Sequence, residues 1–291
     1  MDSRYIFVGN RRFVLEQMLY HRVNLVATIV IAGTHLERDI SGGVLPALKD
    51  HTVVSSKSEL IELLKQSQFD VLVSNGCPYI LPVMELPKAR YVNIHPSCLP
   101  DLRGADPAIG ALLFKRDTGA TCHVMDAGID TGPIISQIRI PYSDDLDVTT
   151  VYQLSFIAEK KVFSDALERS FEPQLAQADY PNIIYYTRKS EDQFITFAEP
   201  NEQILQKVKA FNNRSQGCKF IVNGVSYRVF SAKLMHNTFL FETVSVFPEC
   251  VIALSYEGGI VFKKDGAIIR FEDIVSSDGK PLNVGDELRN E

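Results

Sequence analysis

The sequence predicts an α/β protein with a doubly wound, mainly parallel, Rossmann-like sheet, followed by a small C-terminal β domain. Apolar strand-like runs alternate with helix-like segments up to about residue 170, which is the pattern of βαβ units. Beyond residue 172, short strand-like segments are separated by glycine turns. A length of 291 residues favours two domains. We place a first domain with its linker at residues 1–190, and a helix plus β domain at residues 191–291.

Buried strands are predicted where apolar and β-branched residues run together, over residues 4–8, 24–32 and 69–75. A shorter strand is expected at residues 91–95 and an extended segment at 121–126. Helical spacing of apolar residues predicts helices over residues 13–20, 105–115 and 148–171. Ser56 and Glu59 form a capping-box pattern, so another helix is expected from there to about residue 67. The polar, glycine-rich stretch 33–43 is expected to be a loop.

The C-terminal domain is predicted to begin with a helix over residues 202–211 and to continue as a barrel-like, OB-like β structure. Its turn signals are Asn223-Gly224, Glu257-Gly258-Gly259, Lys264-Asp265-Gly266 and Ser277-Asp278-Gly279. The apolar row Phe239-Leu240-Phe241 within this region requires burial of at least part of it.

Charge and composition exclude several classes of protein. The chain is 45% apolar and 23% charged, which is typical of a globular protein, and its net charge of -6 gives no footprint for nucleic acid or anionic membrane. Residues 200–291 hold 11 Lys/Arg and 11 Asp/Glu, so the β domain has no basic excess. Five cysteines without a C-x-x-C pair argue against a disulfide framework or a zinc site. We expect a cytoplasmic protein without a signal peptide, a membrane span or a metal.

Two polar side chains stand near the end of the strand predicted at residues 91–95. Asn93 and His95 are two residues apart, so they share one face of that strand, and Pro96 should end it. Ligands of open α/β sheets bind at the carboxyl ends of strands. An amide and an imidazole there can stabilise an oxyanion and transfer a proton, although a lone histidine at a strand end is more often structural.

Two irregular loops follow this strand. The first, at residues 99–107, holds Arg103 and two carboxylates, and the second, at residues 126–133, places Asp130 between two glycines. The glycines allow a tight turn that can push the carboxylate toward the strand end. Spacing alone supports a possible acid/base site, because each of these residues also has an ordinary role in turns and caps.

Three motifs in this region resemble the signature of the N10-formyltetrahydrofolate-dependent formyltransferases. They are Asn93-Ile94-His95-Pro96-Ser97 followed by Leu99-Pro100, then Arg103-Gly104, then Gly128-Ile129-Asp130-Thr131-Gly132. This family includes glycinamide ribonucleotide transformylase, methionyl-tRNA formyltransferase and enzymes that formylate nucleotide-linked amino sugars, and the chain looks most like the last group. Residues 1–170 carry most of the resemblance; residues 186–192, 208–212 and 227–234 carry a looser one. The resemblance implies N10-formyltetrahydrofolate as co-substrate, no metal, and residues 1–190 as the catalytic domain.

The resemblance assigns catalytic roles to Asn93, His95 and Asp130. Asn93 is expected to stabilise the oxyanion formed when an amine attacks the formyl carbon. His95 is expected either to take the proton of the amine or, in charged form, to support the oxyanion, and the sequence leaves both open. Asp130 is expected to orient His95 and to help move the proton to the leaving N10 atom.

Binding residues follow with less specific signals. The residues expected to line the folate site are Cys77, Tyr79, Ile80, Leu81, Asp126, Gly128 and Ile129, and for the apolar ones ordinary core packing is an equal alternative. The residues expected to contact the acceptor are Gly9, Asn10, Arg11, Arg103, Gly104 and Asp106. Gly9, Asn10 and Arg11 form a strand-to-helix turn suited to a phosphate, with a solvated arginine as the alternative. Asp106 has a helix cap as its alternative role.

The acceptor amine is expected to belong to a nucleotide-linked amino sugar, such as dTDP-4-amino-4,6-dideoxyglucose, as in lipopolysaccharide and O-antigen synthesis. The loop form Arg-Gly-Ala-Asp-Pro at residues 103–107 resembles that branch of the family. Methionyl-tRNA is the main alternative, but residues 33–43 hold one arginine where that branch carries a basic loop. A formate-releasing hydrolase and a silent folate- or nucleotide-sugar-binding module are further alternatives. A homodimer is expected, with no nucleic-acid or membrane partner.

Overall fold

The computed structural model describes residues 3–178 and 180–289 and divides the chain into two compact units. The first unit contains residues 1–107, 117–141 and 152–187. The second contains residues 108–116, 142–151 and 188–291. The main change of unit therefore follows residue 187, and two short segments of the N-terminal half belong to the second unit.

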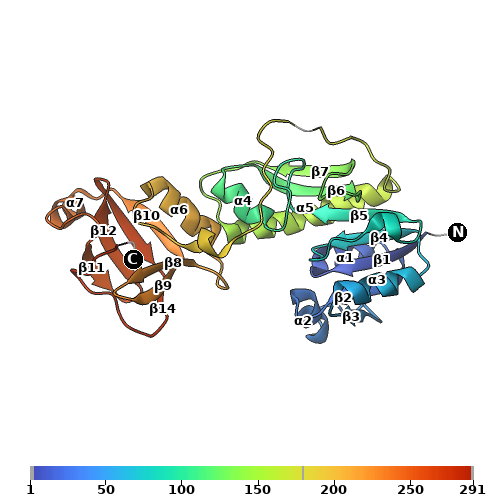
Figure 1. Cartoon of the computed structure of the whole chain (residues 1–291), viewed down its shortest axis with the longest axis horizontal. Helices are drawn as coiled ribbons and strands as arrows, with labels where there is room; N and C mark the ends of the chain where they lie inside the picture. Colours follow the sequence, from blue (N-terminus) through green and yellow to red (C-terminus); the bar gives the residue numbers. More distant parts are fainter. Residues whose placement is uncertain (1–2, 179, 290–291) are drawn as a thin grey trace. The chain divides into compact units, whose positions relative to one another are not determined.

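The first unit is built on a seven-stranded sheet with the order β3-β2-β1-β4-β5-β6-β7. Five strands are parallel, while β6 and β7 run antiparallel to their neighbours, which confirms a mainly parallel α/β sheet (Figure 1). The strands are β1 (Arg4–Gly9), β2 (Asn24–Ile31), β3 (Thr52–Val54), β4 (Val71–Asn75), β5 (Arg90–His95), β6 (Thr118–Val124) and β7 (Ile134–Ile140).

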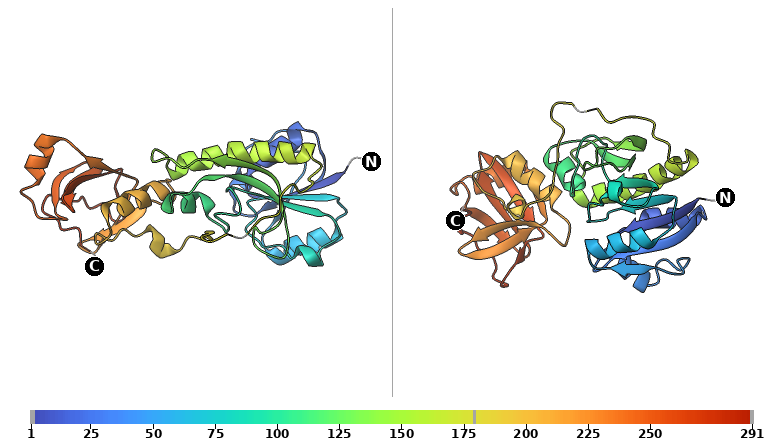
Figure 2. Two further views of the ribbon diagram at one scale, coloured as in Figure 1. Left: turned by 90° about the horizontal axis from the view of Figure 1, so that it is seen from above. Right: turned by 45° about the vertical axis from the view of Figure 1, so that its right-hand side comes forward.

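Helices cover both faces of this sheet because alternate apolar residues of its strands point to opposite sides. Phe7 packs with helices α1 and α5 on one face, whereas Ile6 and Val8 pack with α3 on the other. Figure 2 shows α5 along one side of the sheet and α3 on the opposite side. The helices of the N-terminal half are α1 (Arg12–Tyr20), α2 (His35–Ser41), α3 (Lys57–Gln66), η1 (Val83–Glu85), α4 (Pro107–Leu113) and α5 (Val148–Glu168).

The predicted start of α3 is confirmed, whereas two other segments differ from expectation. Ser56 Oγ accepts a hydrogen bond from the Glu59 backbone N–H at 3.2 Å, as a capping residue does. The stretch 33–43 was expected to be a loop but contains helix α2, because Leu36 is fully buried in the core and Glu37 accepts the Gly33 N–H at 2.6 Å. Strand β7 was not predicted, since its outer half alternates between partly buried and exposed positions.

The second unit contains the small antiparallel β domain that the sequence predicts. Its strands form a four-stranded sheet with the order β10-β13-β12-β11 and a three-stranded sheet with the order β14-β9-β8. Phe197, Phe220, Phe262 and Phe271 pack together with ring centroids 5.1 to 6.4 Å apart. The elements after α5 are η2 (Ser190–Gln193), α6 (Asn201–Ala210), β8 (Cys218–Val222), β9 (Val225–Val229), β10 (Ser231–Met235), α7 (Thr238–Val244), β11 (Ile252–Tyr256), β12 (Gly259–Lys264), β13 (Ala267–Glu272) and β14 (Val275–Ser276).

Helix α7 interrupts the β domain where the sequence suggested continuous β structure. Its Asn237 cap accepts the Leu240 N–H at 2.9 Å. Leu240 packs against the core of the domain, while Phe239 stays 76% exposed, so helical geometry divides the apolar row between the core and the surface. Within the residues that the structure describes, no helix is both long enough and apolar enough to cross a membrane.

Candidate active site

Strands β5 and β6 place three polar side chains together inside the first unit. Asn93 and His95 lie on β5, and the antiparallel register puts His123 of β6 directly opposite Asn93. Asn93 Nδ2 lies 3.3 Å from His123 Nε2. His123 did not enter the sequence argument, because the pairing of β5 with β6 was not predicted. An apolar segment interrupted by a histidine was the only local signal for it.

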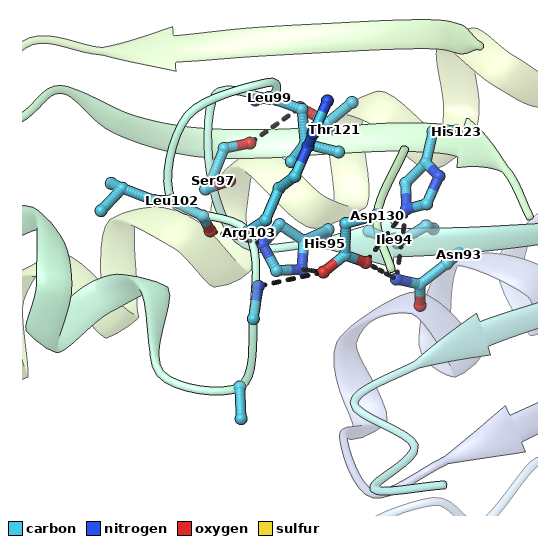
Figure 3. Close-up of polar contacts among 12 residues, drawn as sticks. Asn93, Ile94, His95, Ser97, Leu99, Leu102, Arg103, Thr121, His123 and Asp130 are labelled. Carbon is cyan, nitrogen blue, oxygen red and sulfur yellow. Dashed lines mark hydrogen bonds and ion pairs between the residues drawn. The ribbon is translucent and has the colours of Figure 1, made fainter. Parts of the chain in front are cut away.

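The carboxylate of Asp130 lies between these side chains (Figure 3). One oxygen, Oδ1, is 3.3 Å from Asn93 Nδ2 and 3.5 Å from His123 Nε2. The other, Oδ2, is 3.5 Å from His95 Nδ1 and accepts the Gly104 N–H at 3.2 Å. The structure therefore brings together the three residues expected to be catalytic and adds His123.

The two backbone partners of the histidines fix their tautomers. His95 Nε2 lies 2.9 Å from the Leu102 carbonyl oxygen, and a carbonyl can only accept, so Nε2 carries the proton. His123 Nδ1 lies 2.9 Å from the Val124 carbonyl oxygen and donates in the same way. A neutral His95 consequently presents the Nδ1 lone pair toward Asp130, and a neutral His123 presents its Nε2 lone pair to the Asn93 amide.

Burial and charge act in opposite directions on His95 and Asp130. Burial lowers the pKa of His95 below its usual value, although the Asp130 charge and the Leu102 carbonyl oppose this. Burial raises the pKa of Asp130, but the positive charges that His95 and His123 carry when protonated, together with the Gly104 N–H, outweigh it and hold the pKa below its ordinary value. At neutral pH the site therefore contains an ionised carboxylate beside an uncharged imidazole that can accept a proton.

The loop at residues 96–107 supports this arrangement through its own hydrogen bonds. Thr121 Oγ1 donates to the Ser97 carbonyl at 2.7 Å and accepts the Leu99 N–H at 3.2 Å, which ties the loop to β6. Gly104 has φ 107°, and a Cβ atom there would lie 2.6 Å from the Tyr186 carbonyl oxygen. Only glycine can bring this backbone N–H to the Asp130 carboxylate.

The residues expected to hold the folate fall into two groups. Leu81 is 8% exposed and packs in the core with Cys77 and Tyr79, as the alternative reading supposed. Ile80 is 60% and Ile129 47% exposed, so both are apolar side chains that a ligand could cover.

The loop that carries Ile129 has a defined shape. Asp126 Oδ1 accepts the Gly128 N–H at 3.0 Å and the Thr131 hydroxyl at 2.6 Å, which closes the turn. Asp126 and Gly128 therefore shape this loop.

The residues expected to contact the acceptor have clear partners inside the protein. Arg11 forms an ion pair with Glu159, whose side chain is completely buried, so much of the arginine charge is already compensated. Asn10 lies against Gly76, and the Gly9 backbone packs against that of Asn75. These contacts leave the phosphate role of the turn as a prediction.

Arg103 and Asp106 lie in the loop that follows β5. Arg103 is 3% exposed and offers little surface for direct contact with a substrate. The Asp106 backbone N–H donates to the Tyr186 carbonyl at 3.3 Å. The expected acceptor contact of Asp106 stays a prediction.

Two histidines beside a carboxylate can resemble a metal centre, so the ligand geometry matters. Across residues 3–178 and 180–289, no group of three or more His, Cys, Asp or Glu side chains is arranged to hold an ion. The cluster instead has the make-up of an acid–base site, with an amide, an imidazole and a carboxylate in contact.

A mainly parallel α/β sheet with such a cluster on β5, β6 and the Asp130 loop has the fold and the polar groups of an enzyme that can transfer protons. Comparison with known families gives the particular group. The Formyl transferase family matches residues 37–167, and the Formyl transferase C-terminal domain matches residues 188–290. The chain belongs to the formyl transferase family.

Curated relatives and solved structures differ in the acceptors that their names give. Methionyl-tRNA formyltransferase from Janthinobacterium sp. (strain Marseille) is 28% identical over 238 residues, which cover 80% of this chain and 73% of that protein. The sugar 3N-formyl transferase WlaRD, solved with dTDP and 5-N-formyl-THF, is 19% identical with a TM-score of 0.69 and covers 94% of this chain and 98% of its own.

A second solved structure has the same range of similarity. The N-formyltransferase of Helicobacter canadensis, in complex with folinic acid and dTDP-3-aminofucose, has a TM-score of 0.68 at 18% identity and covers 94% of this chain and 99% of its own. At this level of identity both structures establish a shared fold across both parts of the chain.

Proposed function

We propose that this formyltransferase moves the formyl group of N10-formyltetrahydrofolate to the amine of a nucleotide-linked amino sugar. The observation that carries the reaction is the contact of Asn93, His95 and Asp130 in one partly buried cluster. The exposed side chains of Ile80 and Ile129 offer apolar surface for the folate, which is what small-molecule sites require.

The protein's part in the reaction follows from the tautomer of His95. The acceptor nitrogen attacks the formyl carbon, forming a C–N bond and a tetrahedral oxyanion. His95 Nδ1, a lone-pair site in the neutral ring, takes the proton from that nitrogen, and Asp130 stabilises the imidazolium that results. When the bond from carbon to N10 breaks, the same proton passes to N10 and leaves tetrahydrofolate and the formamide.

Asn93 can donate a hydrogen bond from Nδ2 to the oxyanion. Its Nδ2 atom meets Asp130 and His123 at 3.3 Å, which is long for a hydrogen bond, so the amide can turn toward a formyl oxygen at modest cost. Contacts of this kind often tighten only when substrate is bound.

Charge supports a sugar nucleotide over a transfer RNA. Helix α2 carries Glu37 and Asp39 beside a single arginine, Arg38, in the region where methionyl-tRNA enzymes carry a basic loop. Residues 200–291 are balanced in charge, with 11 Lys/Arg and 11 Asp/Glu. Binding of a polyanion depends on many Lys or Arg contacts to phosphate. Methionyl-tRNA is kept as the second candidate because curated relatives with that name are 28% identical to this chain.

A turnover assay with N10-formyltetrahydrofolate and a panel of amines tests the proposal. The panel contains dTDP-, UDP- and GDP-linked 3-amino and 4-amino sugars, methionyl-tRNA and a control without acceptor, and the readouts are tetrahydrofolate release and product mass. We expect one formyl group to be added to a sugar nucleotide, with loss of this activity in Asn93→Ala and His95→Ala. Activity on methionyl-tRNA alone would replace the sugar with the second candidate, and folate turnover without acceptor would indicate hydrolysis.

A further inference from the structure

A glutamine in the segment after α5 reaches the loop that carries the catalytic carboxylate. Gln177 Nε2 donates to the backbone carbonyl of Asp130 at 2.9 Å and to that of Gly132 at 2.7 Å. Its Oε1 accepts a hydrogen bond from Arg103 Nη2 at 2.9 Å. Both ends of this amide are therefore used, and all four residues belong to the first unit.

The Asp130 backbone needs such support. Its φ of 55° lies in the left-handed region, which is unfavourable for a residue with a side chain. The backbone conformation sets the direction of the carboxylate, which lies 3.5 Å from His95 Nδ1. A pair of donors on the carbonyls of Asp130 and Gly132 fixes the loop on both sides of its turn.

Arg103 connects this glutamine to the loop at residues 96–107, which follows β5 and supplies the Gly104 N–H to Asp130. Its second terminal nitrogen, Nη1, donates to the Tyr185 hydroxyl at 2.5 Å, and its guanidinium lies 5.4 Å from the centre of that ring. The backbone of Arg103 accepts the Tyr186 N–H at 2.8 Å and donates to the Ile184 carbonyl at 3.0 Å. The buried arginine thus spans the loop after β5 and the segment that follows α5.

The same segment is also anchored on the other side of Gln177. The Ile134 N–H donates to the Leu175 carbonyl at 2.7 Å, and the Leu175 N–H returns to the Ile134 carbonyl at 3.1 Å. Gln177 is therefore held between a β-bridge to β7 at Leu175 and the pairing with Arg103 further along.

We propose that Gln177 is a positioning residue of the active site, which holds Asp130 in register with His95 through the two carbonyls of its loop. The proposal rests on the proposed function for the catalytic roles of Asp130 and His95. Glutamine is required because it combines two donors for the carbonyls with an acceptor for Arg103, and a glutamate would supply only the acceptor.

The test uses the full-length protein with 13C-labelled histidine and follows the pH titration of His95 by NMR without substrate. Its signal is identified among the six histidines by its absence from a His95→Gln variant. Asp130, His123 and Arg11 are the charged or titratable groups that act on His95, and Asp130 is the one that raises its pKa. Loss of the Gln177 donors lets the carboxylate drift away, so the titration midpoint of His95 should move to lower pH in Gln177→Ala.

Gln177→Met separates donation from packing, because it keeps the side-chain length, adds no charge that would act on His95, and removes both donors to the Asp130 loop. We expect the same downward shift of the His95 midpoint in this variant, with kcat reduced about 10- to 100-fold and KM for the formyl donor little changed. Gln174→Ala is the matched control, since Gln174 lies in the same segment and its side chain donates only to the exposed Glu172 carbonyl. It should change neither quantity.

An unchanged His95 midpoint in both Gln177 variants overturns the inference. A shift in Gln177→Ala but not in Gln177→Met also overturns it, because it assigns the effect to packing. The NMR measurement needs no acceptor, so it decides the role of Gln177 even if the turnover panel rejects an amino sugar.

Discussion

The tautomer of His95 is set by a single backbone carbonyl. Because Leu102 O accepts from Nε2, the other nitrogen of a neutral ring has no proton and faces the Asp130 carboxylate. Burial keeps the ring neutral by lowering its pKa. Of the two roles that the sequence leaves open, this geometry favours the role of proton acceptor.

The dependence of kcat/KM on pH in the acidic range follows from the uncharged form of His95. A base must be uncharged to act, so kcat/KM should rise with pH through the His95 pKa and level off above it, with the limb below the usual histidine value of 6.5. Initial rates between pH 4.5 and 8 would give the midpoint. A rate that increases on acidification would instead indicate a charged His95 supporting the oxyanion.

Removal of the Asn93 amide should reduce turnover with little effect on folding. Asn93→Ala is expected to lower kcat by about 10²–10³-fold, as is typical when one oxyanion donor is lost. Single-turnover kinetics measures this, with circular dichroism as a check on the fold. Asn213→Ala is the matched control, because it removes an amide from a surface turn of the second unit. A fall of less than tenfold in Asn93→Ala would remove this residue from the catalytic set.

At the scale of elements, α5 shows which face of a helix stabilises the fold. Phe163 is completely buried and lies 6.1 Å from the Phe171 ring, whereas Ile157 on the same helix is 54% exposed. Phe163→Ala should lower the free energy of unfolding by about 3–5 kcal/mol, because it removes a buried ring and leaves a cavity. Ile157→Ala should change it by no more than about 0.5 kcal/mol. Urea unfolding followed by circular dichroism compares the two, and equal effects would contradict the packing described for α5.

Loss of the side-chain cap at the start of α3 should lower the free energy of unfolding by less than loss of a core ring. Ser56 accepts the Glu59 N–H, and the Glu59 carboxylate accepts the Ser55 N–H at 2.8 Å, so two donors at the helix start are satisfied by side chains. Ser56→Ala should reduce the free energy of unfolding by about 0.5–2 kcal/mol. Glu62→Ala is the control, since Glu62 is an exposed residue of the same helix that lies away from its start. Equal losses in the two variants would show that the cap contributes nothing.

At the scale of the whole molecule, binding of folate should stabilise the fold. A ligand that binds only the folded state adds about 2.7 kcal/mol at a concentration of 100 times its Kd. Folinic acid should therefore raise the melting temperature in a concentration-dependent way. Ile80→Ser should weaken the rise, because the mutation removes an apolar side chain that is 60% exposed without ligand. An unchanged melting temperature at millimolar folinic acid would argue against the folate site.

The homodimer is a separate prediction that a solution mass measurement tests.

Local patterns were sufficient for much of the first unit. Continuous apolar runs identified β4 and the second half of β2, because strand segments buried on both faces favour apolar residues at successive positions. The capping pattern at Ser56 identified the start of α3, because Ser56 and Glu59 bond to backbone N–H groups only a few residues away. Helix α2 was missed because Leu36 is its only fully buried residue, so its sequence shows little periodicity.

The sequence by itself determined the α/β class, the antiparallel β domain and the residues Asn93, His95 and Asp130, since each is marked by a local pattern or a motif. Only the tertiary structure decided which side chains join them. His123 comes opposite Asn93 through the antiparallel register of β5 and β6. Gln177 reaches Asp130 across 47 positions of sequence. Contacts of this kind depend on strand pairing and chain path, which are properties of the whole fold and leave no local trace in the sequence.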